Sequence, residues 1–252
     1  MTPAPSDAVT GPEAIRAARA SWRRGQIVEA AVRLMEEQGF HQMSVSSLAR
    51  EAGISVGTIY QYLDSKEDIL LLILEDVLRT YAREVPQSMA GLSDPLERLA
   101  AGFLAYCRVV DSHQAATLLA YRESRSLSRS GLQTVIGLEV ETTGLLVAEL
   151  GAALGAGSLR PHDTELVGWD LMMLAHMWAL KHWHFSAYQD VAAYGRAQLA
   201  LVLDGLVVDR DRERYARLLM LPERRAAALA AAGAHRDPGA SGATGDGPAE
   251  QP

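Results

Sequence analysis

Apolar residues along most of this chain recur every three or four positions, which is the period of an α-helix with one buried face. The clearest early series stops at Gly39, a residue type that commonly follows the last turn of a helix, and it predicts a helix over residues 22–38. Its apolar face consists of Ile27, Ala30, Ala31, Leu34 and Met35. We find no convincing alternation of apolar and polar residues, so no strand is predicted.

Later helices are predicted from similar series and from their caps. Ser93 or Asp94 can cap a helix whose first turn contains Pro95. A very apolar helix ends near Phe185, and a further helix spans about residues 188–208. The predicted fold class is therefore all-α, with nine or ten helices.

The most informative segment is residues 44–66, where two short helices flank a tight turn. Ser44 and Ser55 can each cap a helix, and Gly53 between them can supply the positive φ of the turn. This spacing is typical of a helix-turn-helix, in which small residues let the two helices cross closely. The residues expected to face inward are Val45, Leu48, Ala49, Ala52, Val56, Ile59 and Leu63.

The second short helix leaves a set of small, hydroxyl-bearing or amide residues pointing outward. Such side chains suit a helix that lies in a major groove and contacts base edges and phosphates. An ordinary corner between two helices is the alternative, but the bracing helix before the pair and Lys66 just after it favour DNA binding. The outward set comprises Ser55, Gly57, Thr58, Tyr60, Gln61 and Tyr62.

Charge changes this picture only slightly. The formal net charge is −7, which taken alone argues mildly against a nucleic-acid partner. Residues 11–66, however, carry seven cationic and six acidic side chains, so the acidic excess lies almost wholly after residue 66. Four arginines within residues 16–24 form a basic run, which we expect to contact the DNA backbone unless it is simply solvated.

Composition also limits the location and the chemistry. Cys107 is the only cysteine, so no intrachain disulfide is possible. We see no secretory leader and no uncharged apolar stretch long enough to span a bilayer, and we expect a cytoplasmic protein with no membrane partner. His176, His182 and His184 do not share one helical face, so we expect no metal, and no cofactor motif is present.

Residues 22–75 resemble the N-terminal domain of TetR/AcrR-family transcriptional regulators. Leu63 stands where the family usually has Phe, which keeps the position apolar. The resemblance implies a homodimeric repressor, not an enzyme, in which a three-helix DNA-binding domain precedes a larger helical domain for ligand binding and dimerisation. The residues that carry it are Ile27, Ala30, Ala31, Leu34, Gly39, Phe40, Val45, Leu48, Ala49, Ala52, Gly53, Ser55, Gly57, Thr58, Ile59, Tyr60, Tyr62, Ser65, Lys66 and Leu70.

This resemblance also implies domain limits and DNA contacts. We expect a disordered basic arm (1–20), the helix-turn-helix domain (21–66), the ligand-binding and dimerisation domain (67–222), and a mostly disordered tail (223–252). By analogy, phosphates of double-stranded operator DNA are contacted by Tyr60, Tyr62 and Lys66, and by backbone N–H groups near Ser44 and Ser46. Residues expected to face bases are Val56, Gly57, Thr58 and Gln61.

Two regions of the second domain are candidates for binding a small effector. Large rings and methionines suit an adaptable apolar pocket, while nearby cations suit an anionic head group. Packing within the dimer core and structural ion pairs are the alternatives. The candidates are Tyr121, Arg122, Arg125, Trp169, Met173, Met177, Trp178, Lys181 and His182.

Residues 121–127 and 177–183, which contain several of these candidates, are similar to the corresponding segments of the branch of the family that senses acyl-CoA thioesters. Competing effectors are a lipophilic cation, as in multidrug-sensing relatives, or a neutral aromatic compound, and a helical enzyme is the rival class. A cation site needs carboxylates in the pocket, for which Glu139, Glu141 and Asp170 are the obvious candidates.

We expect the dimer to form through the helices at about 163–184 and 188–208, packed as a four-helix bundle. Small residues there allow close approach, and neighbouring aliphatic residues supply apolar area. These are Ala192, Gly195, Ala197 and Ala200, and Leu199, Val202, Leu203 and Leu206.

Overall fold

The computed structural model describes residues 12–221 and is all-α over this range, as predicted. An isolated bridge between Leu159 and Val207 is the only extended pairing among these residues. The helices are α1 (Pro12–Gln38), α2 (Val45–Glu51), α3 (Val56–Ile59), α4 (Glu67–Met89), α5 (Pro95–Ser112), α6 (Gln114–Glu123), η1 (Ser124–Ser126), α7 (Arg129–Gly155), α8 (Thr164–Leu180), α9 (His182–Phe185), α10 (Val191–Leu206), η2 (Asp209–Asp211) and α11 (Ala216–Leu219).

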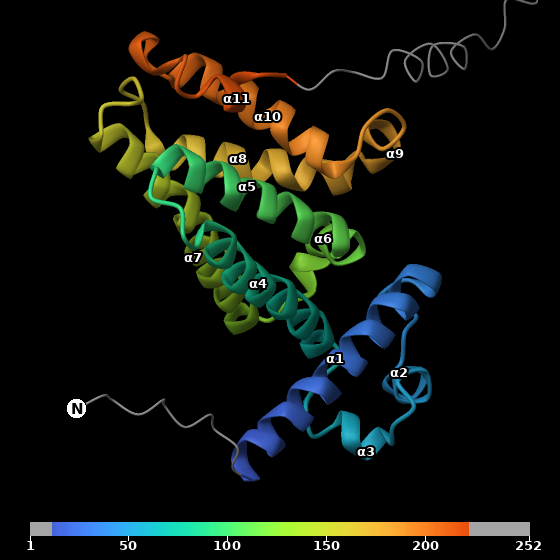
Figure 1. Cartoon of the computed structure of the whole chain (residues 1–252). Helices are drawn as coiled ribbons and strands as arrows, with labels where there is room; N and C mark the ends of the chain where they lie inside the picture. Colours follow the sequence, from blue (N-terminus) through green and yellow to red (C-terminus); the bar gives the residue numbers. More distant parts are fainter. Residues whose placement is uncertain (1–11, 222–252) are drawn as a thin grey trace, which may run out of the picture.

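The chain forms a small N-terminal unit joined by α4 to a larger helical unit (Figure 1). In the small unit α1 packs on α2 and α4, and α2 packs on α3. Its buried anchors include Ile27, Leu48 and Ile59, which are fully inaccessible to solvent. The predicted helix-turn-helix followed by a larger helical domain is therefore confirmed.

Side-chain caps explain where several helices begin. Ser44 and Ser47 form a reciprocal capping box. The backbone N–H of each serine donates to the side-chain hydroxyl of the other at 3.0 Å. The Ser55 hydroxyl accepts from the N–H of Thr58, and Asp94 accepts from the N–H groups of Leu96 and Glu97. Gly53 has φ +66°, as the predicted turn requires.

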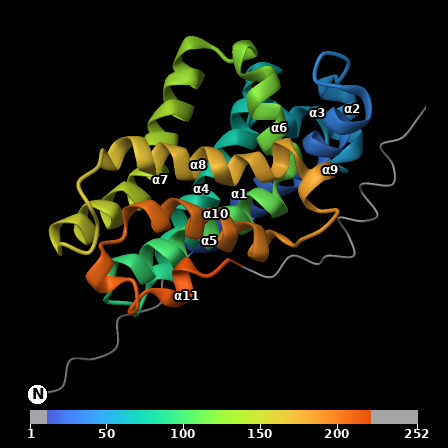
Figure 2. The ribbon, with the colours of Figure 1, turned by 90° about the horizontal axis from the view of Figure 1, so that it is seen from above.

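The core of the larger unit is built around α5. Phe103 and Tyr106 of this helix are fully buried between α4, α7, α8 and α10. Seen from above, α8 and α10 cross this unit beside one another (Figure 2). A Cβ on Gly195 would meet Leu104, so this glycine serves the approach of α10 to α5 within one chain.

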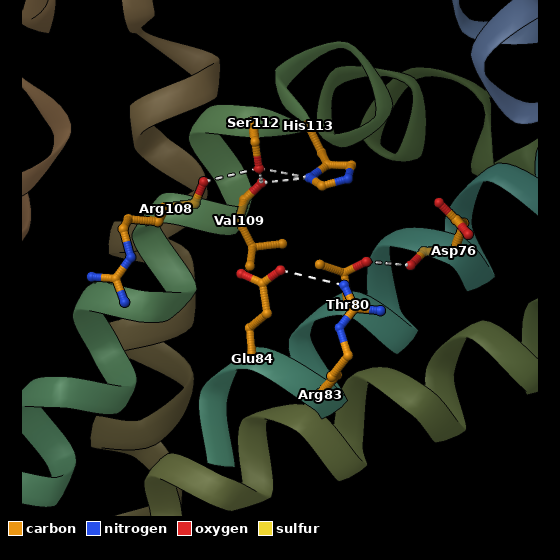
Figure 3. A network of polar contacts seen from close by, with 8 residues as sticks. All are labelled: Asp76, Thr80, Arg83, Glu84, Arg108, Val109, Ser112 and His113. Carbon is orange, nitrogen blue, oxygen red and sulfur yellow. Dashed lines mark hydrogen bonds and ion pairs between the residues drawn. The ribbon is translucent and has the colours of Figure 1, made fainter. Parts of the chain in front are cut away.

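A sharp corner separates α5 from α6 (Figure 3). His113 has non-helical backbone angles and its Nδ1 lies 2.9 Å from the carbonyl oxygen of Val109. The Ser112 hydroxyl donates to the same carbonyl at 3.1 Å and contacts Nδ1 of His113. The Val109 carbonyl also accepts from the backbone N–H of His113 at 3.0 Å, so these bonds together close the last turn of α5 where α6 begins.

Two element limits differ from those predicted. Residues 12–20 continue α1 instead of forming a disordered arm, because their alanines, Glu13 and arginines favour helix. The apolar helix stops at Leu180, where Lys181 leaves the helical region, and no Pro or Gly marks this break in the sequence. Residues 1–11 and the tail from 222 lie outside the described range.

No helix within residues 12–221 is long and apolar enough to cross a membrane.

Candidate functional site

Most of the residues predicted to face DNA lie in α3 or within three residues of its ends. Ser55, Gly57, Tyr60 and Gln61 are exposed, whereas Thr58 and Tyr62 are partly buried. Ile59 and Leu63 fasten the other side of this segment to the core. Ser44 and Ser46, at the start of α2, are also exposed.

Val56 faces outward, which corrects its assignment to the inner face. Its side chain is exposed, whereas Ile54 in the turn is partly buried and packs against the core. Because Ile54 fills the space at this end of α3, Val56 remains on the surface with Gly57. This position agrees with the role that the family resemblance gave to Val56.

Lys66 lies beside this surface but is engaged within the small unit. Its Nζ donates to the carbonyl oxygen of His41 at 2.7 Å and lies 4.9 Å from the centre of the Phe40 ring. The lysine thus fastens the start of α4 to the loop after α1.

The four arginines of the basic run, which lie within residues 16–24 of α1, have different surroundings. Arg24 donates to Glu75 of α4 at 2.6 Å, so this arginine links α1 to α4. The guanidinium of Arg23 lies 5.4 Å from the Trp22 ring centre. Arg16 and Arg19 are exposed and remain available to a phosphate backbone.

The larger unit contains a cavity of about 460 Å³ between α4, α6, α7 and α8. Its wall is mostly aliphatic and aromatic, and none of the residues within 12–221 that form it is Lys or Arg. Leu132, Ile136 and Met173 are exposed at its rim, while Leu74, Leu78 and Met172 are buried.

Six polar side chains, Ser124 among them, interrupt this apolar lining. The Tyr121 hydroxyl lies 2.9 Å from Nδ1 of His176, and Tyr81 and Thr117 lie deeper, nearly inaccessible to solvent. Burial lowers the pKa of His176 to about 4, so the imidazole is neutral at neutral pH. Desolvation also raises the pKa of Glu139, the one carboxylate in the wall.

The cavity includes some of the predicted ligand residues and not others. Tyr121, Trp169 and Met173 line it. Trp178 instead donates its indole N–H to Asp111 at 2.7 Å and packs against Tyr194, so its role is structural. The predicted residues that do not line the cavity are Arg122, Arg125, Met177, Trp178, Lys181 and His182.

Sequence reasoning missed part of the wall. Tyr81, Thr117 and His176 gave no signal as ligand residues, because buried tyrosines, threonines and histidines also occur in ordinary cores. Of the three carboxylates named for a cation site, Glu139 lines the cavity, whereas Glu141 and Asp170 are exposed.

Comparison with known proteins decides the family. The family model "Bacterial regulatory proteins, tetR family" matches residues 27–73. The chain is 37% identical over 196 residues to the HTH-type transcriptional regulator HbdR of Aromatoleum sp. (strain CIB), covering 78% of this chain and 86% of that protein. The chain belongs to the TetR family.

Other members of the TetR family extend this likeness over the larger unit. The HTH-type transcriptional repressor KstR2 of Rhodococcus jostii is 29% identical over 212 residues, which are 82% of this chain and 98% of that protein. The structure of FadR from Bacillus subtilis in complex with stearoyl-CoA shares the fold, with a TM-score of 0.61 at 22% identity, over 71% of this chain and 97% of that one. This TetR-family chain is a DNA-binding transcriptional regulator, of a family that is not enzymatic.

Proposed function

We propose that this regulator is a homodimeric repressor in the cytoplasm whose affinity for double-stranded operator DNA is changed by an acyl-CoA thioester. The observation that carries the proposal is the apolar cavity, whose wall includes α4, the helix that also leaves the DNA-binding unit. A ligand that favours one position of α4 changes how α3 meets the major groove.

DNA binding uses the exposed surface of α3 and the first turn of α2. Tyr60 offers a hydroxyl to a phosphate, and Gln61 offers an amide to a base edge. Ser44, Ser46, Ser55, Val56, Gly57, Thr58, Tyr62 and Lys66 complete the proposed DNA surface.

Three features connect the cavity to this surface. Val77 and Ala116 belong both to its wall and to a second hollow between α1, α4 and α6. At the end of α6, Glu123 lies 3.7 Å from His41 of the DNA-binding unit. The carbonyl of His41 is in turn held by Lys66. A ligand that moves α6 therefore acts directly on the DNA-binding unit.

An acyl-CoA thioester suits the distribution of charge around the cavity. The apolar wall accepts an acyl group, and the absence of Lys or Arg from it requires the phosphates to stay outside. Arg122 and Arg125 are exposed and are adjacent in sequence to Tyr121 and Ser124, which belong to the wall, and we expect them to hold such phosphates. The FadR structure with stearoyl-CoA supports this choice through the shared fold.

The dimer uses the outer faces of α8 and α10. Leu166 of α8 and Leu201 of α10 are exposed apolar residues on these helices. Gly195, Leu199, Ala200 and Leu203, which we expected at the interface, are instead buried inside one chain. The interface therefore consists of the neighbouring exposed positions.

A lipophilic cation is the second candidate effector, because Glu139 places one carboxylate in a wall that also holds Trp169, Tyr81 and Tyr121. Calorimetric titration of the whole protein separates the two candidates. We expect octanoyl-CoA to bind and tetraphenylphosphonium not to bind. Binding of the phosphonium alone would replace the thioester by a cation, and binding of neither would remove both.

A further inference from the structure

We propose that the first turns of α1 form a second DNA contact, in which Arg16, Arg19 and Arg23 bind phosphates that flank the half-site read by α3. We call these three residues the arginine stripe. The inference rests on the DNA surface of α3 given under the proposed function, and it extends the contact beyond that surface. The sequence alone predicted a disordered arm here, whereas the structure shows a continuous helix with a defined cationic side.

The arginine stripe continues the buried side of α1. This helix packs on α2 and α4 and buries residues that recur every three or four positions, among them Ile27, Ala30 and Leu34. The same steps, counted back toward the start of the helix, reach Arg23, Arg19 and Arg16. Residues at this spacing share one side of an α-helix. The arginines therefore project from the side of α1 that faces the rest of the small unit.

This part of α1 extends past the core of the small unit. The structure describes five side chains on the helix before residue 23, and all are exposed: Arg16, Ala18, Arg19, Ala20 and Trp22. Residues 12–22 rise roughly 15 Å along the helix axis. The start of α1 and the α3 segment both lie at the end of the molecule away from the larger unit (Figure 1). The stripe is thus held at the end of the protein that meets the duplex.

The cations of the stripe have no acidic partner within residues 12–221. None of the three forms an ion pair over this range, and Arg23 contacts only the ring of Trp22 among charged and aromatic groups. Arg24 differs, because it pairs with Glu75 of α4. Glu75 also lies 3.5 Å from Arg79, so two cations already share this carboxylate. The stripe therefore keeps its positive charge for an external anion.

Duplex DNA is the anion that fits this arrangement. The stripe rises about 10 Å from its first arginine to its last, and one DNA strand presents a phosphate roughly every 3.4 Å along the axis. Cations repeated along a helix suit a repeating polyanion better than a single small anion. DNA is also the polyanion that a DNA-binding regulator brings to this end of the molecule. Such phosphate contacts carry no sequence preference and position the protein on the duplex.

The length of the duplex tests where this contact lies. A preferred duplex is first selected from random sequence with the whole protein. It is then made in two lengths, one that ends at the outer edges of the two half-sites and one with about ten more base pairs on each side. We expect the flanked duplex to bind about tenfold or more tightly at about 0.1 M salt, because it alone supplies phosphates to the stripe.

Matched variants assign the effect of the flanks to the stripe. Arg16→Gln combined with Arg19→Gln removes two cations from each protomer and keeps residues that favour helix. The dimer then loses four phosphate contacts, so a plot of log affinity against log salt for the flanked duplex should become less steep by about 3–4. The advantage of the flanks should fall to about twofold or less.

Two controls separate this contact from other effects of charge. Arg16→Lys combined with Arg19→Lys keeps both cations and should keep most of the salt slope. Arg108→Gln combined with Arg217→Gln removes the same charge from exposed positions on α5 and α11 of the larger unit, and should change the slope by less than about 1.

The outcomes separate this inference from the function on which it rests. Equal binding of the two duplex lengths, or an unchanged salt slope in the Gln variant of the stripe, would overturn the second contact. Equal losses in the larger-unit control, or a Lys variant that behaves like the Gln variant, would also overturn it. The surface of α3 would stand in each of these cases. If selection recovers no preferred duplex, the proposed function itself is wrong.

Discussion

Individual side chains at α3 have separate tasks, and substitutions can distinguish them. Ile59 and Leu63 hold the segment to the core, whereas Tyr60 and Gln61 face outward. A phosphate contact adds affinity for any sequence, whereas a base contact adds affinity only for the right one.

We therefore expect opposite signatures from two substitutions on this surface. Tyr60→Phe should weaken operator and scrambled DNA about equally, by roughly 0.5–1.5 kcal/mol. Gln61→Ala should lower the preference for the operator by about 1–3 kcal/mol and leave scrambled DNA nearly unchanged. Fluorescence anisotropy with both duplexes measures this, and identical effects of the two changes would remove the distinction.

Two helical glycines give a second residue-scale prediction. A Cβ at Gly168 of α8 would clash with the side chain of Val147, so Gly168→Ala should lower the free energy of unfolding by about 1–3 kcal/mol. Gly151 of α7 is exposed and has open space, so Gly151→Ala should raise it by about 0.5–1 kcal/mol. Urea titration of both variants checks the two signs, and a stabilised Gly168→Ala variant would contradict the packing of α7 on α8.

At the scale of elements, Asp94 joins the start of α5 to the end of the described chain. Its carboxylate accepts from the N–H groups of Leu96 and Glu97, from Arg214 at 2.6 Å and from the Tyr215 hydroxyl at 2.8 Å. Burial by itself would raise the pKa of Asp94, but the bonds from Tyr215, Glu97 and Leu96, together with the charge of Arg214, lower it overall.

A carboxyl group with a lowered folded-state pKa stabilises the fold above its ordinary pKa and loses that effect as the pH falls through the lower value. Asp94→Asn should therefore cost about 1 kcal/mol at pH 7 and progressively less below about pH 4. Asp163→Asn is the control, since Asp163 accepts only from the N–H of Leu166 at the start of α8 and does not join two segments. Thermal unfolding across pH checks this, and a constant cost down to pH 2 would exclude the titration of Asp94.

Much of the helical architecture was predictable because its signals are local. Ser44 and Ser55 as caps and Gly53 in the turn act within four residues of their own positions and were assigned correctly, and of the two candidates Ser93 and Asp94 it is Asp94 that caps α5. The cavity was not predictable in the same way, since its wall combines residues of α4, α6, α7 and α8. Tyr81 and His176 acquire their role only when those helices pack, and the break at Lys181 has no local signal.

On the scale of the whole molecule, the proposed dimer would hold two DNA-binding units together through the outer faces of α8 and α10. Leu201→Glu places a charge on an exposed apolar position of α10, and we expect it to give a monomer by light scattering at micromolar concentration. The affinity of this variant for operator DNA should also fall, because a monomer contacts one half-site of the operator whereas a dimer contacts two at once. Val140→Glu, a similar change at an exposed position of α7, should leave the dimer intact. A dimeric Leu201→Glu variant would move the interface elsewhere.

The most direct test of the central claim is the operator affinity of the whole protein with and without a saturating acyl-CoA thioester. The same measurement is made on Ala120→Phe, which fills the cavity from α6. We predict that the thioester changes the affinity of the unsubstituted protein at least about fivefold, the lower end of typical allosteric coupling, and has no effect on a variant that still binds operator. Affinities that are the same with and without every thioester would contradict the account.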